Sequence, residues 1–141
     1  MKDKLILVLL AVIVSICLVG CDTNSTSIDN LLNALQKEEI VDKNLELLDT
    51  VIETEYLVPS RTTYYIYKES NSNIIAINYN TNIYAKNDYD YSITIYYNVV
   101  YNEDLLTYDW NEYDLDNQKE YIAYETKPLF SKTKYSIEEV N

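Results

Sequence analysis

Apolar and polar residues alternate strictly through the middle of the chain. Odd-numbered positions there are apolar, aromatic or β-branched, whereas the even positions are mostly Asn, Asp, Ser or Thr. A period of two residues is typical of β-strands with one buried face. We therefore predict a hairpin in which a three-residue loop, Lys86–Asp88, places Tyr79 opposite Ile95. Ile77 then faces Tyr97. The odd-numbered set is Ile75, Ile77, Tyr79, Thr81, Ile83, Ala85, Tyr89, Tyr91, Ile93, Ile95, Tyr97, Val99 and Tyr101.

The open end of this hairpin departs from the alternation. Ile74 and Val100 are apolar although they fall on the otherwise polar, even-numbered face, and the predicted register pairs them. A pair of apolar residues on a solvated face is unfavourable. We therefore expect this end to be covered on both sides, with an amino-terminal helix as one candidate cover.

Helical spacing replaces the alternation near residue 30. Ser27 is suited to cap a helix that begins at Ile28, and Asp29 complements the dipole of its first turn. The apolar stripe of this helix is Ile28, Leu31, Leu32 and Leu35.

Residues 45–58 fit two patterns. Val41, Leu45, Leu48 and Ile52 recur at helical spacing, but Thr50–Thr54 is rich in β-branched residues, and apolar or β-branched residues alternate from position 52 to 58. The alternation favours a strand over Asp49–Val58, which Pro59 would end.

The remaining strand patterns complete a fold class. We predict α+β, mainly β, with one amino-terminal helix packed on an antiparallel meander of about five strands. The later strands are predicted at Arg61–Glu69, Leu105–Trp110, Lys119–Thr126 and Tyr135–Val140.

Composition narrows the chemistry. The chain has no histidine and one glycine, Gly20, so it lacks the usual general base and the glycine-rich loops that bind phosphates. We predict that the protein is not an enzyme and that it holds no cofactor or metal. Because no glycine follows Gly20, we expect Asn and Asp to occupy left-handed turn positions, including Asn87 or Asp88 in the hairpin loop.

The chain begins with a pattern typical of an export signal. Lys2 and Lys4 precede the run Leu5–Val19, which is apolar apart from Ser15. The run is shorter than the roughly 18 apolar residues of a helix that spans a membrane. We therefore predict that residues 1–20 are a cleaved signal peptide.

The end of this leader, Leu18-Val19-Gly20-Cys21, resembles the lipobox of bacterial lipoproteins. The resemblance implies that the thiol of Cys21 receives diacylglycerol and that a signal peptidase cuts between Gly20 and Cys21. Two acyl chains suffice for stable anchoring. It therefore implies an extracytoplasmic protein anchored to the cell membrane. Separately, the polar run Asp22–Ser27 predicts that residues 21–27 are a lipidated tether, and since no internal repeat or second linker follows, we predict that residues 28–141 are a single globular domain.

The charge of the exported part restricts its partners. The whole chain carries −12, and the leader carries +1, so the remainder carries −13. Such a domain repels phosphate backbones, which argues against nucleic-acid binding. Cationic partners are the ones that electrostatics favours, although acidity also keeps an exported protein soluble.

One late segment combines carboxylates with aromatic rings. A cationic peptide could bind there through ion pairs and cation–π contacts, with Tyr108, Trp110 and Tyr113 as the aromatic partners. The alternatives are that Trp110 is a core anchor, which we favour, and that the segment is a solvated loop. The candidate partner-binding residues are Tyr108, Asp109, Trp110, Glu112, Tyr113, Asp114 and Asp116.

The sequence thus favours a membrane-anchored, non-enzymatic module that binds a protein or peptide. One alternative is capture of cationic peptides for self-protection, similar to lantibiotic-immunity lipoproteins. This resemblance rests on anchor, size and acidity, without a shared motif. Another alternative is a structural accessory of an envelope complex.

Overall fold

The computed structural model describes residues 26–57, 60–81, 91–126, 129 and 134–140. The lipobox, the signal peptide and the hairpin loop predicted at 86–88 lie outside these residues. Within these residues the elements are one α-helix, one 3-10 helix and eight strands: α2 (Thr26–Lys37), β1 (Glu46–Glu55), β2 (Ser60–Lys68), β3 (Ile74–Thr81), β4 (Tyr91–Tyr96), β5 (Val100–Asn102), β6 (Thr107–Asp109), η1 (Leu115–Asn117), β7 (Gln118–Thr126) and β8 (Lys134–Glu139).

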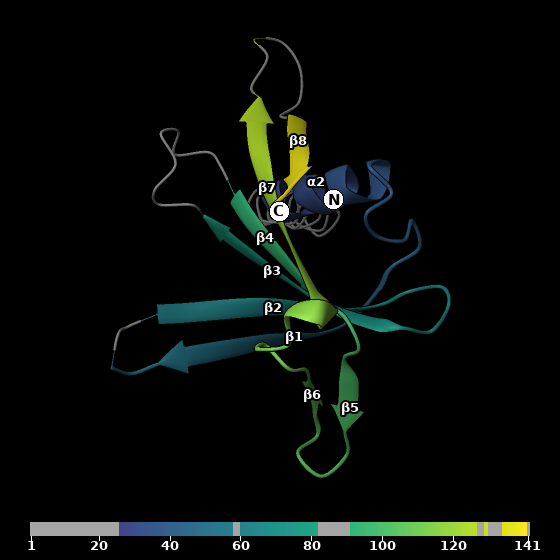
Figure 1. Ribbon diagram of the computed structural model, residues 1–141, viewed down its shortest axis with the longest axis vertical. Coiled ribbons are helices and arrows are strands. Elements are labelled where there is room, and N and C mark those ends of the chain that lie inside the picture. Colours follow the sequence, from purple (N-terminus) through teal and green to yellow (C-terminus); the bar gives the residue numbers. More distant parts are fainter. Residues whose placement is uncertain (1–25, 58–59, 82–90, 127–128, 130–133, 141) are drawn as a thin grey trace, which may run out of the picture.

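A six-stranded antiparallel sheet in the order β1-β2-β3-β4-β7-β8 forms the body of the fold. The sheet twists strongly, from the flat-lying β1 and β2 to the steep β7 and β8 in Figure 1. Strands β5 and β6 lie between β4 and β7 in the sequence. They form a separate two-stranded ribbon that projects below the sheet in Figure 1. The predicted fold class, mainly β with one helix on an antiparallel meander, is confirmed.

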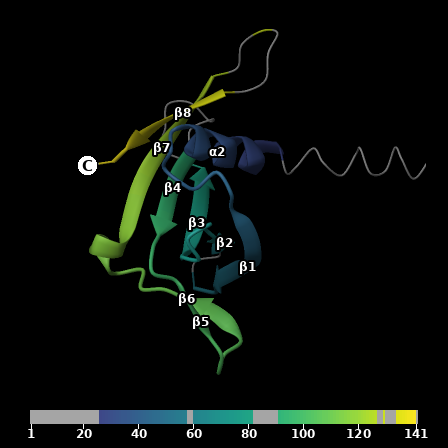
Figure 2. The ribbon, with the colours of Figure 1, turned by 90° about the vertical axis from the view of Figure 1, so that its right-hand side faces the viewer.

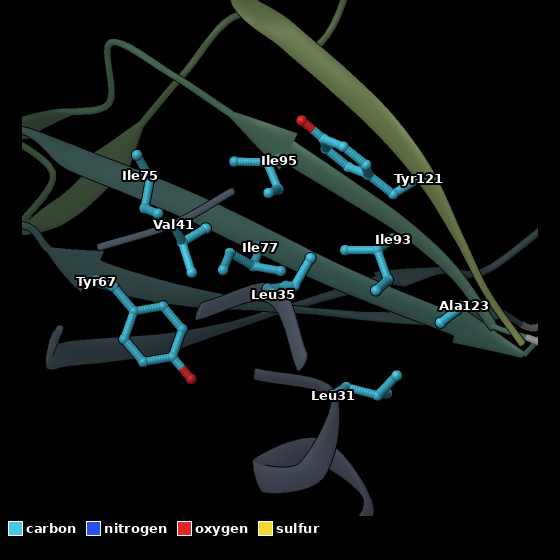
Figure 3. Close-up of a cluster of buried hydrophobic side chains, with 10 residues drawn as sticks. All are labelled: Leu31, Leu35, Val41, Tyr67, Ile75, Ile77, Ile93, Ile95, Tyr121 and Ala123. Carbon is cyan, nitrogen blue, oxygen red and sulfur yellow. The ribbon is translucent and has the colours of Figure 1, made fainter. Parts of the chain in front are cut away.

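Helix α2 covers one face of the sheet (Figure 2). Leu31 and Leu35, from its predicted apolar stripe, are fully buried. They meet the odd-numbered side chains of the sheet, so the alternation correctly identified the buried face (Figure 3). The buried cluster, here called the helix-side core, comprises Leu31, Leu35, Val41, Tyr67, Ile75, Ile77, Ile93, Ile95, Tyr121 and Ala123.

Both ends of α2 differ in detail from the prediction. The helix begins at Thr26, so Ser27 lies inside it and is not the cap. Several Ser and Thr residues precede the apolar stripe, and each is a suitable cap. At the other end Glu39 is left-handed with φ 58°, the Ile40 N–H donates to the Leu35 carbonyl at 3.0 Å, and the Glu39 N–H donates to the Gln36 carbonyl at 3.1 Å. These two bonds form a Schellman motif that ordinarily uses glycine.

The predicted hairpin register is wrong by two residues. Strand β3 does pair with β4, and odd positions do face odd positions, so Tyr79 and Ile95 lie on the same face. However, Ile77 faces Ile95, and Tyr79 faces Ile93. The observed register places isoleucines together beneath the helix, whereas the predicted one would put the polar-tipped Tyr97 opposite the fully buried Ile77.

The even-numbered face is covered as well, but not by the helix. After β4 the chain leaves the sheet and folds back over this face, where Val99 packs with Ile66 and Ala76. The predicted pairing of Ile74 with Val100 is wrong: Val100 pairs with Asp109 in the small ribbon, while the Val99 N–H donates to the Ile74 carbonyl at 3.3 Å. The buried members of this second cluster, here called the loop-side core, are Tyr64, Ile66, Ala76 and Val99.

Strand β1 settles the ambiguity of residues 45–58. It is a strand, as favoured, but it spans Glu46–Glu55 and so begins and ends three residues earlier than predicted. A bulge lies between Leu47, opposite Tyr67, and Asp49, opposite Ile66. The extra residue reverses the alternation beyond it. Val51 consequently packs on the loop-side core, on the same face as Tyr64.

Turns follow a different rule from the one predicted. Among the described residues, the non-glycine positions with positive φ are Glu39, Ser72, Asn98 and Leu106, of which one is Asn and none is Asp. Asn and Asp instead shape turns through side-chain oxygens that accept a backbone N–H two residues later. This occurs at Asp42, Asn71, Asn102, Asn111 and Asp114.

Candidate functional site

The acidic and aromatic segment predicted from the sequence packs on the loop-side core. Trp110 is half-buried, and its ring lies 4.8 Å from that of Tyr64 and 6.1 Å from that of Tyr96. Tyr64 and Tyr96 themselves meet edge to face at 6.0 Å. Trp110 is therefore a packing anchor, as favoured above, and it holds residues 107–113 against the sheet.

A hydrogen bond fixes a carboxylate beside this aromatic group. The Tyr64 hydroxyl donates to Oε1 of Glu112 at 2.8 Å, joining residues 48 positions apart. Burial is the main cause that raises the pKa of Tyr64, and its bond to Glu112 raises it further, so the hydroxyl stays protonated and remains a donor. This bond anchors the Glu112 side chain over β2.

A second carboxylate, Glu53 on β1, lies near enough to the first for their charges to interact. Partial desolvation raises the pKa of the exposed Glu53 from its ordinary value of 4.5, the negative charge of Glu112 raises it further, and the nearby Tyr64 hydroxyl offsets part of the rise. Like charges so close together oppose ionisation. The pair would therefore be stabilised by a cation placed between its members.

A hollow of about 390 Å³ opens next to these two carboxylates. One wall is β1, and the other is the segment that includes β6 and the residues after it. Its lining combines carboxylates, aromatic rings and one aliphatic residue: Val51, Glu53, Thr107, Tyr108, Asp109, Trp110, Asn111, Glu112 and Tyr113. We call this hollow the β1 pocket. Among the described residues, three carboxylates and no cationic side chain line it.

Trp110 contributes an unsatisfied donor as well as a ring. Its indole Nε1 is buried and has no hydrogen-bond partner among the residues that the structure describes. A buried N–H without an acceptor costs about 1–3 kcal/mol.

The structure brings together most, but not all, of the predicted residues. Five of the seven line the β1 pocket: Tyr108, Asp109, Trp110, Glu112 and Tyr113. Asp114 and Asp116 do not. Asp114 instead caps η1, where its side chain accepts from the Asp116 N–H at 3.2 Å. Proximity in sequence to Trp110 was therefore a poor guide for these two residues, because the chain turns away after Tyr113.

Sequence reasoning missed the opposite wall of the pocket. Val51 and Glu53 reach it because the bulge near Leu48 reverses the alternation of β1. Without the bulge, Ile52 would point to this face. Neither the bulge nor the packing of residues 107–113 beside β1 leaves a local sequence signal.

A larger hollow, of about 440 Å³, lies where β3 begins and β4 ends, and Glu69 is the one charged residue that the described part of the chain contributes to its lining. Among the described residues, no three Asp, Glu or Cys side chains are grouped to hold a metal ion. No helix in that part of the chain is long and apolar enough to cross a membrane.

Comparisons with protein-family models, curated proteins and solved structures each find no significant match.

Proposed function

We propose that this protein is a lipid-anchored, extracytoplasmic and non-enzymatic module that captures a cationic segment of a protein or peptide in the β1 pocket. The observation that carries the proposal is the lining of the pocket, where Glu53 and Glu112 lie with the ring of Trp110 and the described residues contribute no cation. The net charge of −13 outside the leader supports it, because such a field attracts cationic partners from a distance.

The pocket suits a lysine or arginine side chain. Two carboxylates would share the positive charge, and the indole face of Trp110 would contribute a cation–π contact of about 0.5–1 kcal/mol at a partly exposed site. The clustered charge should increase the association rate more than the final affinity. Capture of cationic peptides for self-protection is one role that fits this chemistry.

The anchor is part of the proposal and has its own test. The lipobox Leu18–Cys21 supports lipidation of Cys21, which would hold the domain at the outer leaflet of the cell membrane. In the native host, Cys21→Ala should accumulate as uncleaved precursor without lipid. Normal processing and membrane retention of that variant would contradict the lipoprotein assignment.

Binding to octa-lysine tests the pocket directly. We expect the soluble domain with Glu53→Gln and Glu112→Gln to bind more slowly and with a flatter salt dependence than wild type, because its pocket has lost two charges. The matched control is Asp104→Asn with Asp116→Asn, which removes the same charge from exposed sites that do not line the pocket.

The two double variants distinguish a site from a general field. If both lower the association rate equally, overall charge attracts the peptide and the pocket is not its site. If wild type does not bind octa-lysine at all, cationic capture is wrong. Circular dichroism of each variant confirms that it is folded.

A second function, as a structural accessory of a membrane complex, is favoured by a separate observation. The β5-β6 ribbon carries exposed apolar side chains at Val100, Leu105 and Leu106, with exposures of 60%, 69% and 75%. A contact through these residues would be hydrophobic and would persist at high salt. Pulldown from native membranes at low and high salt separates this function from charge-driven capture.

A further inference from the structure

The sheet has two edges, and they differ. Strand β8, at one edge, has six residues, packs beside α2 and is tied to its neighbour by the ion pair Lys119–Glu139 at 3.7 Å. Strand β1, at the other edge, has ten residues, and its outer side pairs with no described strand. A long edge with unpaired N–H and C=O groups is a template for an added strand.

The hydrogen bonds show which residues of β1 direct their backbone outward. The Thr63 carbonyl accepts from Nδ2 of Asn78 on β3 at 3.0 Å, so Thr63 directs its backbone away from β1. In an antiparallel ladder its partner Ile52 must then direct both backbone groups away from β2. Thr50 and Thr54, two residues before and after Ile52, also point their backbone N–H and C=O groups away from β2.

A hydrogen bond of Thr50 supports this direction of its backbone. Its N–H donates to the Asp49 carboxylate at 2.7 Å, and thus does not bond to β2. The row of outward-facing backbone groups therefore runs along Thr50, Ile52 and Thr54, and within it the Thr50 N–H is already bonded to Asp49. It passes beside Val51 and Glu53, whose side chains line the β1 pocket.

The charges of β1 favour one kind of added strand over another. Strand β1 carries four acidic residues and no basic one: Glu46, Asp49, Glu53 and Glu55. Acidic groups along an edge repel another copy of the same strand, because like charges in paired strands are destabilising. They attract a basic one.

We propose that an extended basic peptide adds to the free edge of β1 as a seventh strand of the sheet. Main-chain hydrogen bonds to Thr50, Ile52 and Thr54 would supply affinity, and a basic side chain that reaches Glu53 and Glu112 would supply specificity. This inference rests on the proposed capture of a cationic segment and states the conformation in which that segment binds.

Ile52→Pro tests the edge, because proline removes the outward N–H but no bond of the sheet. With a capped, alternating Lys–Thr peptide as probe, we expect the affinity to fall roughly tenfold, the effect of losing one hydrogen bond and its geometry. The matched control Ile52→Val keeps the N–H and should bind as wild type does. Unchanged affinity in the folded proline variant would overturn the proposal.

A second measurement needs no variant of the protein. Successive residues of a strand direct their backbone N–H groups to opposite sides. We therefore compare two versions of the probe, one with methyl groups on the backbone nitrogens of its lysines and one with methyl groups on those of its threonines. The two versions lack N–H donors on opposite sides of the strand. We expect one methylated peptide to lose binding to the wild-type domain and the other to keep it. Equal binding of the two would overturn strand addition.

Strand addition can fail while capture in the pocket stands, and the two failures are distinguishable. If Glu53→Gln with Glu112→Gln weakens octa-lysine binding while both edge tests fail, the pocket captures cations without strand addition. If octa-lysine does not bind at all, the proposed function fails together with this inference.

Discussion

The two faces of the sheet are covered in different ways. The helix-side core is closed by Leu31 and Leu35 of α2 over isoleucines that are fully buried. The loop-side core is closed by a segment with little regular structure, through the rings of Tyr108 and Trp110. A helix presents a continuous apolar stripe, whereas an irregular segment covers a face only where its side chains reach. The β1 pocket lies where that cover ends.

This contrast separates stability from binding. Each face contains one buried polar atom without a partner among the described residues, the Tyr79 hydroxyl on the helix side and Nε1 of Trp110 on the loop side. The carboxylates of the pocket, Glu53 and Glu112, lie beside the second atom. We infer that the helix-side core mainly stabilises the fold. The loop-side core is packed less completely, and the β1 pocket lies beside it.

The largest predicted effect is a difference in the free energy of unfolding between two isoleucine variants, one on each face of the sheet. Ile77 and Ile66 are both fully buried, on neighbouring strands and opposite sides. Ile77→Ala should lower the free energy of unfolding by about 4–5 kcal/mol and Ile66→Ala by about 2–3 kcal/mol, because the irregular cover can settle into a cavity better than a helix can. Urea denaturation measures both values. Equal losses would remove the contrast between the faces.

The hydrogen bond under the pocket gives a smaller effect. Tyr64→Phe removes the donor to Glu112 and should lower the free energy of unfolding by about 1.5 kcal/mol, as expected for a bond to a charged group. Octa-lysine should also bind more weakly, because Glu112 loses its positioning. A loss of stability with unchanged binding would assign Tyr64 to the core alone. Thermal unfolding and binding kinetics on the same preparation decide between these results.

The helix side should respond to the same chemical change with the opposite sign. The Tyr79 hydroxyl is buried without a described partner, and burial is the main cause that raises its pKa. Tyr79→Phe keeps the ring contact with Tyr65, at 5.7 Å, and should raise the free energy of unfolding by about 1 kcal/mol. A destabilised variant would indicate that this hydroxyl has a partner in solution.

The smallest effect is a pH dependence. Because the pKa of Glu53 is raised in the folded state, its charged form destabilises the fold at neutral pH, and this cost disappears as the pH falls through the raised pKa to below 4.5. Glu53→Gln should therefore be more stable than wild type at pH 7, by under about 0.5 kcal/mol, and equally stable in acid. Thermal unfolding across this range measures the difference. A constant difference would exclude Glu53 as the titrating group.

Local pattern was sufficient for much of the fold. Alternation along residues 75–81 and 91–95 identified two strands and their buried face, and helical spacing identified α2. These features depend on where successive side chains point, which neighbouring residues determine by themselves. The acidic segment with Tyr108, Trp110 and Glu112 was also visible as a candidate binding surface, and five of its seven residues line the β1 pocket.

Tertiary structure decided the rest. The register that pairs Ile77 with Ile95 depends on what fits beneath Leu35, and a shift of two residues preserves the alternation, so the pattern could not detect it. The site depends on a bulge that turns Glu53 towards Glu112, 59 positions later in the chain. Such a juxtaposition is a property of packing between distant segments, and no local pattern of residues encodes it.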